Sequence, residues 1–268
     1  MSIRPKTIRR VILLTVICLL STAAGWGLYL RNEHGKQIRA EAERVAGLEA
    51  YDAGDHAAAL PLLHRYLNRV NDDREALLAY ATARARVESP GGRHLADAIG
   101  VLTNRLLAQH PDDLDAQQLL LQLYVEAYRN DLAVALADRL IQKRPDDPEI
   151  LKARAIALSR TDRVDAALQA ALAYIAIVPL DAREQLRTLW LMDRNRLSPK
   201  AMIEHAAKLL ADHPDDPRAE LVLAVAHGYG SDHRTALDLL RRAAARPGLD
   251  PQTVREIVAK FDSLKRFD

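Results

Sequence analysis

A turn that recurs at a constant interval is the feature that most constrains this chain. The motif Pro-x-Asp occurs four times with spacings of 34, 34 and 35 residues, at Pro111, Pro145, Pro179 and Pro214. A fixed period of this length indicates stacked supersecondary units. Proline cannot continue the helix before it, and the aspartate two positions later is a good N-cap for the next helix. New helices are therefore predicted to open at Asp113, Asp147, Asp181 and Asp216.

A second marker follows the same period. Small residues are expected to open the other helix of each unit, at Ala59, Ala98, Ala133, Ala167, Ala201 and Ala236. A small side chain there lets the two helices of a hairpin approach closely. The longer step between the first two alanines fits an inserted loop, Ser89-Pro90-Gly91-Gly92.

Composition and periodicity together predict an all-α protein. Only 4% of the 268 residues are aromatic, whereas strands favour aromatic and β-branched side chains. Apolar residues recur at three- and four-residue spacing within the units, as amphipathic helices require. The expected helix pairs span about 36–70, 73–110, 113–144, 147–178, 181–213 and 216–246, with one further helix at about 250–264.

The repeat resembles the tetratricopeptide repeat, a helix–turn–helix unit of 34 residues. One unit carries the family's large and small residues at Leu120, Tyr124, Ala133 and Pro145, and the next carries them at Ala155, Leu158, Ala167 and Pro179. A later unit has Leu223, Ala224, Ala236 and Pro247, and the first has Gly47, Gly54, Ala59 and Leu63. The resemblance covers roughly residues 40 to 268 and implies a right-handed α-solenoid of about six such pairs plus a C-terminal helix.

Three departures from the family pattern stand out. One is the inserted loop, and another is the segment Arg194–Ser198, which replaces a tight turn. The third is Pro61, which removes a backbone hydrogen bond inside a predicted helix and is expected to kink or shorten it.

The N-terminus is predicted to cross a membrane. Four basic residues within residues 1–10 precede Val11–Leu30, a stretch of twenty residues without charge. At about 1.5 Å per residue this stretch would span a hydrocarbon core. By the positive-inside rule residues 1–10 form a cytoplasmic tail, and residues 41–268 form an extracytoplasmic repeat domain joined by a helical stalk at 31–40. The alternative is a signal peptide cleaved near Ala24, which would release a soluble periplasmic protein.

No chemistry-bearing motif is found. The chain has 38 basic and 36 acidic residues, so it lacks the charge excess of a nucleic-acid binder. Cys18 is the only cysteine, and the paired aspartates lack the loop of a calcium site, so we expect no metal and no cofactor. There is no catalytic His-Glu-x-x-His or Gly-x-Ser-x-Gly motif. The sequence therefore predicts a protein that is not an enzyme and has no small-molecule substrate.

The resemblance instead implies a protein or peptide partner held in a concave groove lined by the first helices. Matching places in the repeat are Gln118, Gln122, Lys152, Ile156, Leu186, Trp190, Leu221 and Val225. Members that bind the Hsp90 tail use a lysine and an asparagine where Gln118 and Gln122 stand, so that carboxylate clamp is not expected here. Trp190 has two interpretations, a groove anchor or a core residue within Leu189–Met192.

The expected function is a membrane-tethered protein–protein interaction scaffold of a bacterial envelope, contacting the lipid bilayer through Val11–Leu30. The alternatives are the cleaved periplasmic form and an anchored chaperone or receptor for client polypeptides. The C-terminal helix, with Val254, Ile257, Val258, Phe261 and Leu264 at helical spacing, is either a cap or the first helix of a truncated unit.

Overall fold

The computed structural model describes residues 34–88 and 91–246, together with Trp26, Arg255 and Ala259. The predicted cytoplasmic tail, most of the predicted membrane helix at 11–30 and most of the C-terminal helix at 250–264 lie outside the described residues. Among the residues that are described, we find no helix with the length and apolar character needed to span a membrane. The chain divides into two units, Met1–Pro111 and Asp112–Asp268.

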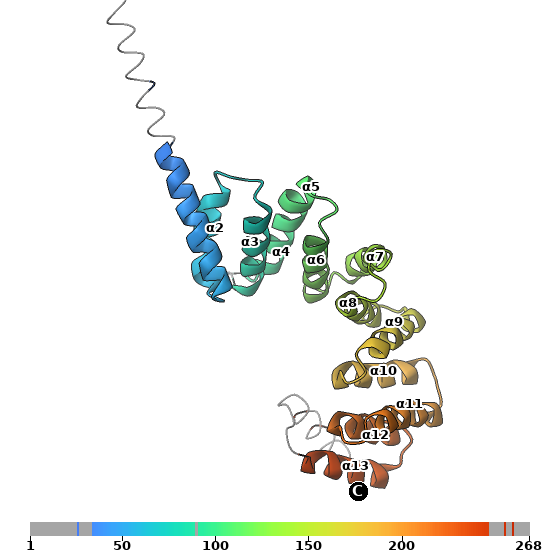
Figure 1. Cartoon of the computed structure of the whole chain (residues 1–268). Coiled ribbons are helices and arrows are strands. Elements are labelled where there is room, and N and C mark those ends of the chain that lie inside the picture. The colour runs from blue at the N-terminus through green and yellow to red at the C-terminus, as the bar shows by residue number, and fades with distance from the viewer. Residues whose placement is uncertain (1–25, 27–33, 89–90, 247–254, 256–258, 260–268) are drawn as a thin grey trace, which may run out of the picture. The chain divides into compact units, whose positions relative to one another are not determined.

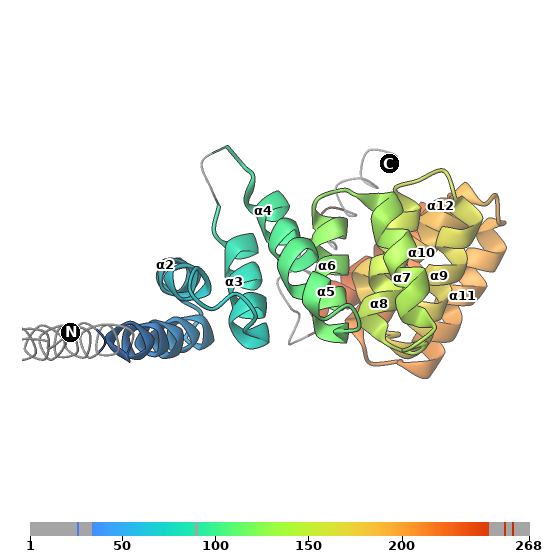
Figure 2. The ribbon, with the colours of Figure 1, turned by 90° about the horizontal axis from the view of Figure 1, so that it is seen from above.

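The described part of the first unit is built from two helix pairs. A helix covers residues 34–52 and is followed by α2 (His56–Leu67). Next come α3 (Arg74–Arg86) and a continuous helix that comprises α4 (His94–Val101), η1 (Leu102–Leu106) and α5 (Leu107–Gln109). α3 packs between α2 and α4 (Figures 1 and 2).

The π-helical segment η1 absorbs one extra residue. The chain needs 13 residues to pass from Ala98 to the turn at Pro111, but 12 from Ala133 to Pro145. A π turn closes its hydrogen bonds over one more residue than an α turn. Leu102 and Leu106, at its two ends, are both fully buried. The insertion is thus taken up inside the helix, and the buried face stays continuous.

The second unit contains four helix pairs between Asp112 and Arg246. Their bounds are α6 (Leu114–Glu126) with α7 (Asn130–Ile141), α8 (Pro148–Ser159) with α9 (Val164–Ile177), α10 (Ala182–Arg194) with α11 (Pro199–Asp212), and α12 (Pro217–Tyr229) with α13 (His233–Ala245). Successive helices contact one another along the unit (Figure 1). The described residues are therefore all-α, in consecutive pairs at the predicted places.

The predicted helix starts are confirmed at atomic detail. The side chains of Asp113, Asp147, Asp181 and Asp216 each accept a hydrogen bond from a backbone N–H in the first turn of the helix that follows, at 2.8–3.2 Å. Pro148 and Pro217 occupy the first helical position, where the missing N–H has no intrahelical partner to lose. Asp73 caps α3 in the same way, through the Ala76 N–H at 3.0 Å.

The alanine marker is confirmed in five of its six places. Ala59, Ala98, Ala133, Ala167 and Ala236 are fully buried, as close helix packing requires. The assignment of Ala201 is wrong, because that side chain is only partly buried.

Met202 takes the place that was predicted for Ala201. The chain uses one more residue between the N-cap of α10 and the start of α11 than it uses in the other pairs of the second unit. Met202 is therefore the fourth residue of its helix, the position that alanine holds in α2, α7, α9 and α13. Met202 is 1% exposed, and α10 and α11 pack less closely than the other hairpin partners of the second unit.

Pro61 was expected to kink or shorten its helix, and the shortening does not occur. α2 continues through Pro61 to Leu67 and has 12 residues, as many as α7. The Pro61 side chain is exposed, so the ring lies away from the core.

Gly47 is where the helix of residues 34–52 approaches α2 most closely. A β-carbon at this position would lie 2.8 Å from Leu63 Cδ2 and 3.2 Å from the Leu63 backbone nitrogen. Because that backbone cannot yield, we expect Gly47→Ala to destabilise the protein by about 1–2 kcal/mol, even though alanine is the better helix former. Gly100→Ala in α4 is the control, since its β-carbon would meet nothing closer than 3.8 Å and should be neutral or stabilising. Urea unfolding of both variants measures the difference, and equal effects would contradict the proposed close approach.

Candidate interaction surface

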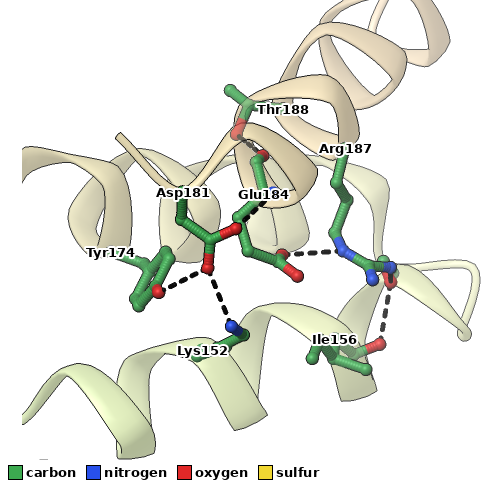
Figure 3. A network of polar contacts seen from close by, with 8 residues as sticks. Lys152, Ile156, Tyr174, Asp181, Glu184, Arg187 and Thr188 are labelled. Carbon is green, nitrogen blue, oxygen red and sulfur yellow. Dashed lines mark hydrogen bonds and ion pairs between the residues drawn. The ribbon is translucent and has the colours of Figure 1, made fainter. Parts of the chain in front are cut away.

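A carboxylate joins three helices of the second unit. Asp181 Oδ2 accepts hydrogen bonds from Lys152 Nζ of α8 and from the Tyr174 hydroxyl of α9, both at 2.8 Å (Figure 3). Its other oxygen caps α10 through the Glu184 N–H at 3.2 Å. We name Lys152, Tyr174 and Asp181 the Asp181 junction.

The junction holds its charges in defined states. Burial raises the pKa of the Asp181 carboxyl, but the hydrogen bonds from Lys152, Tyr174 and the Glu184 N–H, with the lysine charge, outweigh burial and leave the pKa below its usual value. Burial and the neighbouring Asp181 both raise the pKa of the Tyr174 phenol. At neutral pH the site therefore combines an ionised carboxylate with a protonated tyrosine. It has the properties of a structural joint and no general base near neutrality.

A second set of contacts ties α10 to α8 further along. Arg187 Nε donates to Glu184 Oε2 at 2.8 Å (Figure 3). The Nη1 of the same arginine donates to Ser159 Oγ at 3.2 Å. Glu184 is only 1% exposed, so the arginine neutralises a buried carboxylate. α8 and α10 are thus bridged at two points by polar side chains.

The same junction is present in the first unit. Asp73 Oδ2 accepts from Arg44 Nε at 2.6 Å and from the Tyr66 hydroxyl at 2.9 Å. Burial and Asp73 raise the pKa of Tyr66 to about 12. In both junctions the tyrosine precedes the aspartate by 7 residues and the cation precedes it by 29. Neither junction was predicted from the sequence, although those two shared spacings would have revealed them.

Seven of the eight predicted groove residues fall into three groups. Gln118, Gln122, Ile156 and Leu186 are partly exposed on α6, α8 and α10. Lys152 is engaged in the Asp181 junction and is not a free cation. In α12, Leu221 is fully buried and Val225 is 9% exposed. Leu221 has no surface to offer a partner, because α12 packs against α10, α11 and α13 and its residues from Ala219 to Ala226 are all buried.

Trp190 is the most exposed apolar side chain of α10. Its side chain is 39% exposed, while its neighbours Leu189 and Leu191 are fully buried. The Arg194 guanidinium lies 5.5 Å from the centre of its indole ring, within the range of a cation–π interaction. The indole therefore lies at the surface of the first helix of its pair.

A pocket of about 430 Å³ lies between α9 and α11. The apolar part of the pocket wall is formed by Leu172, Ile175 and Leu209. Within the pocket, His205 Nε2 and Gln185 Oε1 lie 3.0 Å apart. Burial and the nearby Lys208 lower the pKa of His205, so the imidazole is neutral at pH 7. No His, Cys, Asp or Glu cluster within the described residues has the geometry of a metal site.

Comparison with solved structures gives the fold its context. A tetratricopeptide repeat protein from Parabacteroides merdae superposes with a TM-score of 0.63 at 15% identity, covering 84% of this chain and 88% of that one. MamA from Desulfovibrio magneticus RS-1 superposes with a TM-score of 0.57 at 16% identity, covering 65% and 94%. A MamA mutant gives 0.56 at 21% identity, covering 65% and 93%.

The chain has the tetratricopeptide repeat fold. At these identities the likeness establishes the architecture and no more. No family model and no curated protein matches the sequence. In α10 one face packs, with Leu189 and Leu191 fully buried, and the other remains open, and Trp190 lies on this open face.

Proposed function

We propose that this tetratricopeptide repeat protein is an interaction scaffold that binds a protein or peptide partner along the open faces of its first helices. The observation that carries the proposal is the partly exposed Trp190 on α10, held beside Arg194. Tryptophan and arginine are the side chains most enriched at binding hot spots. The α8–α10 bridges support it further, because a surface fixed before binding loses less entropy on association.

The proposal includes a membrane tether. The uncharged stretch Val11–Leu30, preceded by four basic residues, supports an N-terminal anchor with its N-terminus in the cytoplasm and the repeats in the periplasm. Cell fractionation with N-terminal sequencing of the mature protein tests this part. A mature chain that starts near Gly25 in the soluble fraction is impossible to reconcile with a tether and would favour the cleaved form.

Trp190→Ala should weaken binding of the natural partner by about 2 kcal/mol, because a hot-spot aromatic ring would be lost. The same change should lower the free energy of unfolding by less than the 3–5 kcal/mol typical of a fully buried tryptophan. Affinity capture with the full chain, followed by calorimetry on the isolated partner and by thermal unfolding, measures both quantities. A large fall in melting temperature with unchanged affinity would mean that Trp190 acts as a core residue and not as a binding residue.

The capture experiment also separates a scaffold from a chaperone. One stoichiometric partner recovered in a Trp190-dependent manner supports the scaffold. Recovery of many unfolded polypeptides would favour the client-receptor alternative.

A further inference from the structure

Four side chains form one stripe along the open face of α10. Arg183, Arg187, Trp190 and Arg194 are spaced by four, three and four residues, which places them in line on a helix. We name these four residues the α10 stripe. The flanking Leu186 is partly exposed and widens its apolar part.

The charges of the stripe are only partly compensated. Arg187 pairs with the buried Glu184, so its charge is neutralised. Arg183 and Arg194 are exposed, and among the described residues neither forms an ion pair with a carboxylate. Burial and the charge of Asp193, the exposed carboxylate of α10, raise the pKa of Tyr229 in α12. Two unpaired guanidinium groups therefore stand on either side of an exposed indole.

We propose that the α10 stripe binds an extended acidic peptide with an apolar side chain between two carboxylates. Arg183 and Trp190 are about 10 Å apart along the helix axis, and Trp190 and Arg194 about 6 Å apart, at roughly 1.5 Å of rise per residue. An extended chain advances about 3.3 Å per residue. Side chains of an extended chain alternate between its two faces, so the residues that face α10 are an even number of positions apart. The complementary motif is an acidic residue, an apolar residue four positions later, and a second acidic residue two positions after that, with the long Arg183 side chain covering the difference in length.

This inference rests on the proposed scaffold function and names the chemistry of its partner. Arginine offers a planar fork that binds a carboxylate through two hydrogen bonds. An aromatic side chain stacked on Trp190 would add to the area buried. Only two cations of the stripe are unpaired, and the whole chain carries a net charge of +2, so a short acidic peptide fits better than the long polyanion of a nucleic acid.

The test uses the full chain and a labelled peptide of glycine and serine that carries this motif, with aspartates as its acidic residues and phenylalanine as its apolar residue. Fluorescence anisotropy should show binding that weakens as salt rises, since exposed ion pairs are screened. The Arg183→Gln, Arg194→Gln double variant and Trp190→Ala should each weaken binding at least tenfold. Arg139→Gln on α7, the removal of an exposed arginine elsewhere, is the matched control and should leave binding unchanged.

Reversing the charges of the two unpaired arginines tests whether binding follows charge complementarity. Arg183→Glu with Arg194→Glu should abolish binding of the acidic peptide and create binding of a peptide with lysines in place of the two aspartates. A peptide with asparagines at those positions should not bind the unchanged protein. Circular dichroism confirms that each variant remains helical.

Three results would overturn the inference: no binding of the acidic peptide, binding that ignores the arginine substitutions, or preferential binding of a single-stranded oligonucleotide. Failure of the peptide while capture of the natural partner still depends on Trp190 would refute only the acidic motif. If Trp190→Ala changed neither peptide binding nor partner capture, the proposed scaffold function would be refuted as well.

Discussion

Asp181→Ala should lower the free energy of unfolding by about 2–4 kcal/mol, a large effect for a side chain at a turn. The substitution removes the N-cap of α10, worth about 1 kcal/mol, and two hydrogen bonds to a charged group, worth about 1.5–3 kcal/mol in the net. It also leaves the partly buried Lys152 and Tyr174 without their common acceptor. Urea denaturation at neutral pH measures the loss.

The matched control is Ser198→Ala, which removes only the cap of α11 through the Ala201 N–H. It should cost about 1 kcal/mol. Asp181→Asn keeps a capping oxygen and removes the charge, so it should fall between the two. A loss from Asp181→Ala no greater than that from Ser198→Ala would mean that the junction contributes nothing beyond the cap.

The lowered pKa of Asp181 predicts how the free energy of unfolding depends on pH. The folded-state pKa of Asp181 lies below its unfolded value of 3.8. The carboxylate therefore contributes its full stability above about pH 4, and this contribution is lost as pH falls through the folded-state pKa. The difference between the unchanged protein and Asp181→Ala should be constant from pH 7 to pH 5 and shrink below pH 3.8. A difference that grew on acidification would refute this assignment.

Ala167→Met should destabilise the protein by about 2–3 kcal/mol, because Ala167 is fully buried where α9 meets its neighbours. Ala173→Met, on the exposed side of the same helix, is the control and should change stability by less than about 0.5 kcal/mol. Thermal and urea unfolding of the two variants give the comparison. α11 accommodates methionine at the equivalent position, so equal tolerance in α9 would mean that the alanine is not required for close packing.

The helix starts could be predicted because they depend on local chemistry. A proline, an aspartate two positions later and a free N–H in the first turn are all within one short segment, as at Pro179 and Asp181. The pairing of helices could be predicted from the period of the Pro-x-Asp motif, which is visible in the sequence. The comparison with solved structures then agreed with the resemblance in fold.

The alanine marker failed at Ala201 because its predicted position assumes a constant period. Packing instead depends on where the helix begins, and α11 begins at Pro199, one residue later than the period predicts. The junctions were missed for a different reason. Their cations lie 29 residues from the aspartate, as in Arg44 and Asp73, so neither residue carries a local sign of the contact. The exposure of Trp190 depends on tertiary packing, and a run of apolar residues in the sequence does not show which of them is exposed.

The Asp181 junction has a consequence for how two first helices of the second unit can move. The junction and the Arg187–Ser159 hydrogen bond fasten α8 to α10, so a force applied to one helix is transmitted to the other. On the other side of α10, α11 packs less closely, and it is joined to α10 by the contact between His205 Nε2 and Gln185 Oε1 at 3.0 Å. We therefore expect the open faces of α8 and α10 to move together, so that a ligand lying across both meets two helices whose spacing is held by side-chain hydrogen bonds.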